Sequence, residues 1–159
     1  MNAKELNSKY KTLLNNYGIN TTLRKAMFFA QIDHESGGFR YLKELGNDAY
    51  FAKYEGRKDL GNTNKGDGLR FKGRGFIQIT GRYNYTVLSK DTRIDYLNNP
   101  KWLEREADAM ISALWYWNTK NLNKYADAKD LKGATKVING GLNGLADREN
   151  KYLLYLKQL

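Results

Sequence analysis

The chain contains no cysteine, one histidine, His34, and one proline, Pro100. Without cysteine it can form no disulfide and carry out no thiol chemistry, and with one histidine we expect no zinc site. The sequence also has no phosphate-binding or dinucleotide-binding glycine motif, and its glycine-rich stretch lacks the order of acidic residues found in calcium loops. The sequence therefore predicts an activity that uses no metal and no cofactor.

Long apolar runs are absent too. No segment approaches the roughly 20 apolar residues of a membrane span. The first seven residues are polar and lack the apolar core of a signal peptide. These features, together with the lack of cysteine, are typical of a chain made in the cytoplasm, and we expect no signal peptide.

Acidic residues are few relative to basic ones. The chain has 27 Lys and Arg against 17 Asp and Glu, a formal net charge of +10. Such a charge predicts attraction to nucleic acid, lipopolysaccharide or anionic wall polymers. Because no helix-turn-helix or RNA-binding signature accompanies the charge, we expect an anionic envelope surface as the partner and no nucleic acid.

Apolar residues recur at helical spacing along most of the chain, which predicts a mainly α-helical domain. The expected helices are 6–17, ended by Gly18; 22–35, capped by Thr21 or Thr22; one from about 83; 102–117; 134–138; and 145–156. Between about 46 and 75 the periodicity fails and glycines recur, which indicates loops or a short β-hairpin. Residues 76–80 are expected to form a short strand or extended segment.

Two glutamates, Glu35 and Glu44, flank the glycine pair Gly37 and Gly38. On one unbroken helix they would lie on opposite faces, about 13 Å apart along the axis. Glycine lets the chain reverse, so the pair permits both carboxylates to line one cleft. One protonated and one ionised carboxyl group are what cleavage of a glycosidic bond requires. Spacing alone does not decide the matter, because most pairs of glutamates lie on protein surfaces.

The residues near the two glutamates favour different protonation states, as this chemistry requires. We expect the apolar residues 27–30 and 76–77 to supply a surface near Glu35, since an apolar surface favours a protonated carboxyl group. Glu44 follows Lys43 in a more polar stretch and is expected to remain ionised. His34 is expected to orient the site, and not to bind a metal.

Three segments, in this order, resemble glycoside hydrolase family 19 and, within it, the short bacteriophage endolysins. They are residues 34–39 (His-Glu-Ser-Gly-Gly-Phe), residues 68–85, and residues 137–144 followed by Asp147 and Arg148. The resemblance implies a lysozyme-like, mainly α-helical fold with a glycine-rich loop or short β-hairpin region and a central cleft. It also implies one catalytic domain over residues 1–159, without a separate wall-binding module. The chain lacks the cysteines and long cleft loops of the plant chitinases of this family, which favours the endolysin branch.

The resemblance assigns roles to individual residues. Glu35 matches the general acid of the family, Glu44 the general base, and Thr80 the hydroxyl residue that helps to hold the attacking water. The positions assigned to substrate binding or to the surroundings of the catalytic pair are His34, Gln78, Asn84, Asn139 and Arg148.

These features predict a monomeric endolysin that hydrolyses β-1,4 bonds between the amino sugars of peptidoglycan by an inverting mechanism and so lyses bacteria. It would stay in the host cytoplasm until release to the cell wall. A chitinase is the alternative among enzymes. A non-catalytic basic domain that binds cell wall or nucleic acid is the alternative of another class. The presence of both Glu35 and Glu44 argues against a wall-binding module that has lost catalysis.

Overall fold

The computed structural model describes residues 1–159, the whole chain, and confirms the expected mainly helical fold. The chain forms two compact units. Unit 1 comprises Met1–Arg40 and Leu114–Leu159, and unit 2 comprises Tyr41–Ala113. None of the helices combines the length and apolarity needed to cross a membrane.

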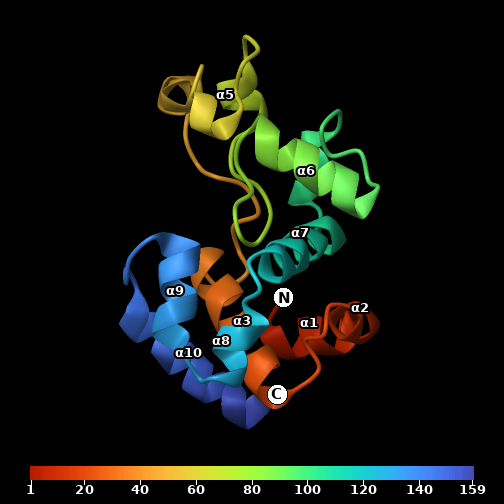
Figure 1. Ribbon diagram of the computed structural model, residues 1–159, viewed down its shortest axis with the longest axis vertical. Coiled ribbons are helices and arrows are strands. Elements are labelled where there is room, and N and C mark those ends of the chain that lie inside the picture. Colours follow the sequence, from red (N-terminus) through yellow and green to blue (C-terminus); the bar gives the residue numbers. More distant parts are fainter. The chain divides into compact units, whose positions relative to one another are not determined.

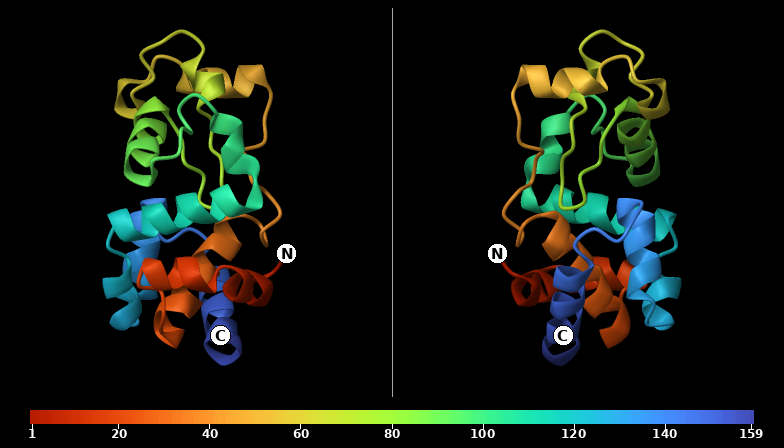
Figure 2. Two further views of the ribbon diagram at one scale, coloured as in Figure 1. Left: turned by 90° about the vertical axis from the view of Figure 1, so that its right-hand side faces the viewer. Right: turned by 90° about the vertical axis from the view of Figure 1, so that its left-hand side faces the viewer.

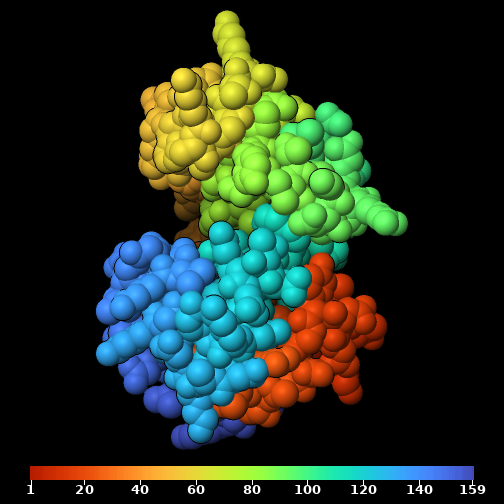
Figure 3. All heavy atoms as spheres, viewed as in Figure 1, coloured from red at the N-terminus to blue at the C-terminus, as the bar shows by residue number.

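Unit 1 is built around one helix, α3 (Thr22–Glu35). Its other elements are α1 (Ala3–Lys9), α2 (Lys11–Asn16), the end of α7 (Glu106–Thr119), α8 (Asn123–Asp127), α9 (Leu131–Asn139) and α10 (Leu145–Gln158). Helices α1, α8 and α10 pack against α3 (Figures 1 and 2). The space-filling view shows α1 and α2 (red) and α8 and α9 (blue shades) at the surface of this unit (Figure 3).

The ends of α3 form as the sequence predicts. The Thr21 hydroxyl accepts a hydrogen bond from the Arg24 amide, 3.2 Å, and so satisfies a donor in the first helical turn. At the other end the helix stops at Glu35, and Gly37 and Gly38 follow with φ of 60° and 79°. Glycine reaches these left-handed conformations without steric cost, so the expected break at this pair is confirmed.

Helix α3 is buried along its middle because its apolar residues face neighbours on several sides. Residues 26–33 are all buried. The Phe28 ring makes edge-to-face contacts with Phe29, centroids 5.2 Å apart, and with Trp117 of α7, 5.4 Å apart. These aromatic contacts anchor the helix that ends at Glu35.

The single helix expected over 6–17 is two helices. The backbone of Tyr10, with φ −108° and ψ 26°, leaves the helical region between α1 and α2. Leu6 and Leu14 are nevertheless both fully buried. The prediction failed because apolar spacing reports which face is buried and does not report whether the backbone between the turns stays helical.

The C-terminal helices are close to the prediction. Helix α9 begins three residues earlier than expected, where Asp130 accepts the Gly133 amide, and ends at Gly140, whose φ is 82°. Helix α10 covers the expected last helix. The short helix α8 was not predicted, because its five residues are too few to show a period.

Unit 2 consists of short helices joined by loops. Its elements are α4 (Asp48–Phe51), η1 (Ala52–Tyr54), η2 (Lys58–Leu60), α5 (Asp67–Arg70), α6 (Arg82–Thr92), η3 (Pro100–Glu104) and the first part of α7. The expected loops over 46–75 are present, but four of these short helices interrupt them and no hairpin forms. Four-residue helices leave no periodic pattern, which explains the difference.

The short strand or extended segment expected over 76–80 does not form. Gln78 adopts a left-handed φ of 58°, and Gly75 and Gly81 on either side also have positive φ. The chain therefore folds back on itself, and the Arg74 and Ile79 backbones exchange hydrogen bonds of 3.1 and 2.8 Å. Only isolated bridges result, Arg74 with Ile79 and Lys43 with Arg74.

A buried ion pair connects two loops of unit 2. The Asp67 carboxylate, 1% exposed, accepts hydrogen bonds from Arg82 Nε at 2.7 Å and Nη2 at 2.9 Å. Asn62, also buried, accepts the Arg82 amide at 2.8 Å. Arg82 is the first residue of α6, so these contacts attach the start of α6 to the preceding loops.

Candidate active site

Glu35, the last residue of α3, is held by a buried arginine of α10. Arg148 Nη2 lies 2.7 Å from Glu35 Oε1, and the Arg148 side chain is 1% exposed whereas that of Glu35 is 23% exposed. The guanidinium also donates to Gln31 Oε1 through Nη1 and to the Asn143 carbonyl through Nε at 3.1 Å. Three fixed contacts leave this guanidinium little freedom, so it fixes the position of the Glu35 carboxylate.

Gln31 shares one face of α3 with Glu35, because residues four apart lie one above the other on a helix. Its amide group donates to the Thr135 hydroxyl at 3.1 Å, and Thr135 donates in turn to the Leu131 carbonyl at 2.8 Å. Gln31 and Thr135 are both fully buried. The contacts of Glu35 and Arg148 therefore continue into the interior of unit 1 through α9.

The hydrogen-bonding partner of the Glu35 carboxylate comes from α10, and the apolar surface expected beside Glu35 stays a prediction. Residues 27–30 are fully buried in unit 1, while Phe76 and Ile77 belong to unit 2. The partner of the carboxylate is the Arg148 guanidinium.

His34 is bonded to an acidic residue of α10. Its Nδ1 lies 2.6 Å from Asp147 Oδ2, and the ring is half-buried. Gly144, with φ 72°, lies directly against the imidazole, and a side chain at position 144 would collide with the ring. The start of α10 thus sets the orientation of His34.

A chain of charged groups continues behind His34. Lys151 Nζ lies 2.8 Å from Asp147 Oδ2 and 3.1 Å from Asp33 Oδ1, and Tyr155 donates to the second Asp33 oxygen. Lys151, and after it His34, lower the pKa of Asp147 through these hydrogen bonds. Burial, followed by the hydrogen bond to Asp33, raises the pKa of Tyr155. Sequence reasoning missed Lys151 and Asp33, although the spacing of Asp147 and Lys151 on one helical face indicates an ion pair.

Asn139 stands apart from these contacts. It is the last residue of α9 and is exposed, and no hydrogen bond joins its side chain to Glu35 or Arg148. Its role in sugar binding stays a prediction.

Glu44 lies in unit 2 and is held on both carboxylate oxygens. Tyr50 and Tyr54 each donate a hydroxyl hydrogen bond of 2.8 Å to Oε2. The Gly73 amide donates to Oε1 at 3.3 Å. Burial, with the hydrogen bond to Glu44 next, raises the pKa of Tyr54, so this phenol stays a donor across the neutral range. Sequence reasoning missed both tyrosines, and their spacing of four on a helical stretch is the signal that could have paired them.

Gly73 is the point at which three predicted site residues meet. A Cβ atom at position 73 would lie 2.7 Å from Gln78 Oε1, 3.1 Å from Glu44 Oε1 and 3.1 Å from Thr80 Oγ1. These polar atoms approach so closely because glycine carries only a hydrogen there. The structure thus brings Glu44, Gln78 and Thr80 together.

Hydrogen bonds to backbone carbonyls hold the side chains of Gln78, Thr80 and Asn84 in place. Thr80 donates to the Gln78 carbonyl at 3.1 Å, and Gln78 donates to the Gly75 carbonyl at 3.1 Å. Asn84 Nδ2 donates to the Thr80 carbonyl at 2.8 Å. The Thr80 carbonyl therefore connects Asn84, on α6, to Glu44, Gln78 and Thr80. We call these four residues around Gly73 the Glu44 cluster.

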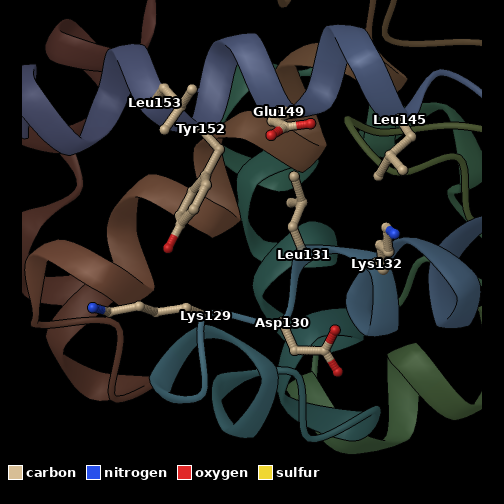
Figure 4. Close-up of a pocket in the computed structure, with 8 residues that line it drawn as sticks. All are labelled: Lys129, Asp130, Leu131, Lys132, Leu145, Glu149, Tyr152 and Leu153. Atoms are coloured by element: carbon tan, nitrogen blue, oxygen red, sulfur yellow. The ribbon is translucent and has the colours of Figure 1, made fainter.

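A hollow in unit 1 of about 290 Å³ is separate from the residues around Glu35 and from the Glu44 cluster (Figure 4). It lies between α10 and the start of α9, and Leu131, Leu145 and Tyr152 contribute to its walls. Neither Glu35 nor Arg148 lines it. The candidate active-site residues are therefore those around Glu35 in unit 1 and the Glu44 cluster in unit 2.

Comparison with known proteins identifies similar chains. The family model described as Chitinase class I, that of glycoside hydrolase family 19, matches residues 14–140. A glycosyl hydrolase family 19 domain-containing protein of Haemophilus influenzae is 33% identical over 159 aligned positions, which cover 82% of this chain and 77% of that protein. An endochitinase of Arabidopsis thaliana is 33% identical over 84% of this chain and 47% of its own length. The chain spans about half the length of such plant endochitinases.

A solved structure agrees with the sequence comparisons. Chitinase C from Streptomyces griseus superimposes with a TM-score of 0.71 at 27% identity, covering 86% of this chain and 59% of that protein. The fold is therefore that of the family 19 chitinases, as the resemblance implied.

Proposed function

Because the chain belongs to glycoside hydrolase family 19, we propose that it hydrolyses β-1,4 bonds between amino sugars and that its natural substrate is peptidoglycan. The observation that supports this chemistry is that two carboxylates are bonded to different kinds of groups. Glu35 is held by a guanidinium on one oxygen, and Glu44 is held by two phenols and one amide. A glycosidase needs two carboxyl groups with different tasks, one to protonate the leaving oxygen and one to activate water.

We assign the acid to Glu35. Arg148 donates to Oε1, so in the protonated acid Oε1 is the acceptor and the proton sits on Oε2. Oε2 then donates to the glycosidic oxygen as the bond breaks. Arg148 acts as a positioning residue, because it decides which carboxyl oxygen is free to donate.

We assign the base to Glu44. Its Oε2 already accepts two phenolic hydrogen bonds, whereas Oε1 lies toward the side of Gly73 where Gln78 and Thr80 gather. In this assignment a water bound to Oε1 and to the Thr80 hydroxyl loses its proton to Glu44 and attacks the anomeric carbon. Direct attack by water inverts the configuration, so a β-linked substrate gives an α-product.

The choice of peptidoglycan is supported by charge. Bacterial wall polymers carry carboxylates and phosphates, and a net charge of +10 favours association with them. Chitin is the second candidate, because relatives with about one third identity are endochitinases. With peptidoglycan as the substrate, the protein would be a monomeric lytic enzyme that remains in the cytoplasm of a bacterial host until it reaches the wall.

The test uses purified peptidoglycan and chitin oligomers side by side. Mass spectrometry of the products released from peptidoglycan should show new reducing ends on amino sugars, and chitin oligomers should be cleaved more slowly. Glu35→Gln, which keeps the shape of the side chain but cannot donate the proton, should lower turnover about 10²–10⁴-fold while the protein stays folded. Rapid cleavage of chitin oligomers with intact peptidoglycan would make the protein a chitinase. Full turnover in folded Glu35→Gln would remove Glu35 from the acid role.

The stereochemical test is independent of the polymer. Proton NMR of the first product formed from a β-linked oligosaccharide should show the α-anomer before mutarotation. A β-anomer would show that Glu44 is not a general base and would point to a covalent or substrate-assisted route.

A further inference from the structure

A second hollow lies in unit 2, outside the Glu44 cluster. Its volume is about 420 Å³, and four cationic side chains line it: Arg70, Lys72, Arg74 and Lys101. Asp48 is the one acidic residue in its walls. We call this feature the basic hollow.

The cations of the basic hollow are not equally neutralised. Arg74 is buried and bonded to Glu104 at 2.9 Å and to the Arg70 carbonyl at 2.7 Å. Lys72 and Lys101 have no ion-pair partner within 4 Å. Burial lowers the pKa of Lys72, and the nearby charges of Arg74, Lys43 and Lys101 lower it further, against a weaker opposing effect of Glu104. The structure therefore holds positive charges close together, and an anion placed between them would be strongly attracted.

A smaller hollow of about 270 Å³ shares Arg70, Pro100 and Lys101 with the basic hollow. It adds Trp102, on η3, together with the amide side chains of Asn98 and Asn99. The Arg105 guanidinium lies 4.8 Å from the centre of the Trp102 ring. An aromatic ring beside amide groups offers an apolar surface and hydrogen-bonding groups together, which suits a sugar ring.

The basic hollow is distinct from the Glu44 cluster but adjacent to it along the chain. None of Glu44, Gln78 and Thr80 lines either hollow. Lys72 and Arg74 flank Gly73, which is the residue around which the Glu44 cluster gathers. Lys72 and Arg74 therefore line the basic hollow, while Gly73 between them lies against the Glu44 cluster.

We propose that the basic hollow binds the phosphate group of a phosphorylated saccharide whose sugar ring lies against Trp102. A phosphate carries up to two negative charges and three terminal oxygens, so it can use several cations at once. Arg70 Nη2 donates to the Leu97 and Asn98 carbonyls at 3.3 Å, which leaves Nε and Nη1 of this guanidinium to donate to the phosphate. This binding goes beyond the proposed hydrolysis and does not depend on it. It would hold the protein on phosphorylated glycans of the bacterial envelope.

Binding is measured by calorimetry at low salt with N-acetylglucosamine 6-phosphate as the probe and N-acetylglucosamine as the neutral reference. We expect binding of the phosphorylated sugar and none of the neutral one. The double variant Lys72→Met and Lys101→Met should weaken binding at least about tenfold, because two charge-assisted contacts are lost. The matched control, Lys58→Met and Lys90→Met, removes the same charge from exposed positions of unit 2 and should bind within about twofold of the wild type.

Three results would overturn the proposal. They are equal weakening in the two double variants, binding of glucuronic acid as tight as that of the phosphorylated sugar, and no binding of the phosphorylated sugar by the wild type. Trp102→Ala should reduce affinity to the level of inorganic phosphate, and an unchanged affinity would remove the sugar from the assignment. Hydrolysis of purified peptidoglycan is measured separately, since failure of the proposed hydrolysis appears there as an inactive wild type and leaves phosphate binding intact.

Discussion

At the scale of single residues, the position of Glu35, the proposed acid, depends on Arg148. Arg148→Lys keeps the charge but replaces a planar fork by one ammonium group, which cannot span Glu35, Gln31 and the Asn143 carbonyl together. We expect kcat to fall about tenfold to a hundredfold with a smaller change in KM, since a misplaced acid affects the reaction more than substrate binding.

The control for this prediction is Arg24→Lys. Arg24 also makes three contacts at α3, two with Asp127 and one with the Gly18 carbonyl, but it does not touch Glu35. It should lose stability with an unchanged kcat. Equal losses of kcat in the two variants would show that Arg148 serves only the stability of the fold.

Gly73 permits a second residue-scale prediction. Its backbone is not in the left-handed region, so alanine is compatible with its conformation, but the added Cβ would lie 2.7 Å from Gln78 Oε1. In Gly73→Ala the oxygens of Gln78, Glu44 and Thr80 must move apart, and we expect kcat to fall about a hundredfold. Steady-state kinetics and thermal unfolding are measured together. A loss of melting temperature with unchanged kcat would contradict the role assigned to this cluster.

At the scale of elements, the pair of Asp67 and Arg82 ties the start of α6 to the loops of unit 2. The hydrogen bond from Arg82 is the main cause that holds the pKa of Asp67 below its ordinary value. A carboxyl group whose pKa is lower in the folded state than in the unfolded chain stabilises the fold above the unfolded pKa of about 3.9. That contribution is lost as the pH falls below this value and through the folded pKa.

We therefore expect Asp67→Asn to destabilise the protein by about 2 kcal/mol at pH 7, because the buried end of the Arg82 pair is lost. The difference from the wild type should shrink as the pH is lowered toward 3. Urea unfolding at both pH values measures it. Asp59→Asn, which breaks the exposed pair with Arg57, should have no measurable effect at either pH. A destabilisation by Asp67→Asn that is the same at pH 7 and pH 3 would argue against the ionic contribution.

Elements with strong end signals were predicted well, and elements without them were not. Thr21 and the Gly37–Gly38 pair mark both ends of α3 in the sequence, and Gly140 marks the end of α9. Tyr10 carries no such signal, so the break between α1 and α2 was missed. In unit 2, the turn at Gln78 depends on a left-handed backbone conformation, which a glutamine in the sequence does not predict. The four short helices of residues 48–70 show no hydrophobic period.

The site was predictable to a similar, partial extent. The motifs predicted Gln78 and Thr80, the pair of glutamates predicted Glu44, and the structure gathers all three around Gly73. The motifs also gave Arg148, but its contact with Glu35 could not be derived, because it joins residues 113 positions apart. The hydroxyl partners of Glu44 are Tyr50 and Tyr54, which lie among many tyrosines that have other surroundings, so composition alone could not single them out.

At the scale of the whole molecule, the net charge of +10 is spread along the chain and most lysines are exposed. Interactions between exposed charges are screened over about 8–10 Å at physiological ionic strength. Lysis of whole cells or intact walls should therefore weaken as salt rises from low to physiological concentrations and above. Cleavage of a small neutral oligosaccharide should respond much less, because such a substrate offers no charge to attract. Turbidity and oligosaccharide assays over one salt series compare the two, and equal salt sensitivity on both substrates would show that the positive charge does not bring the protein to the wall.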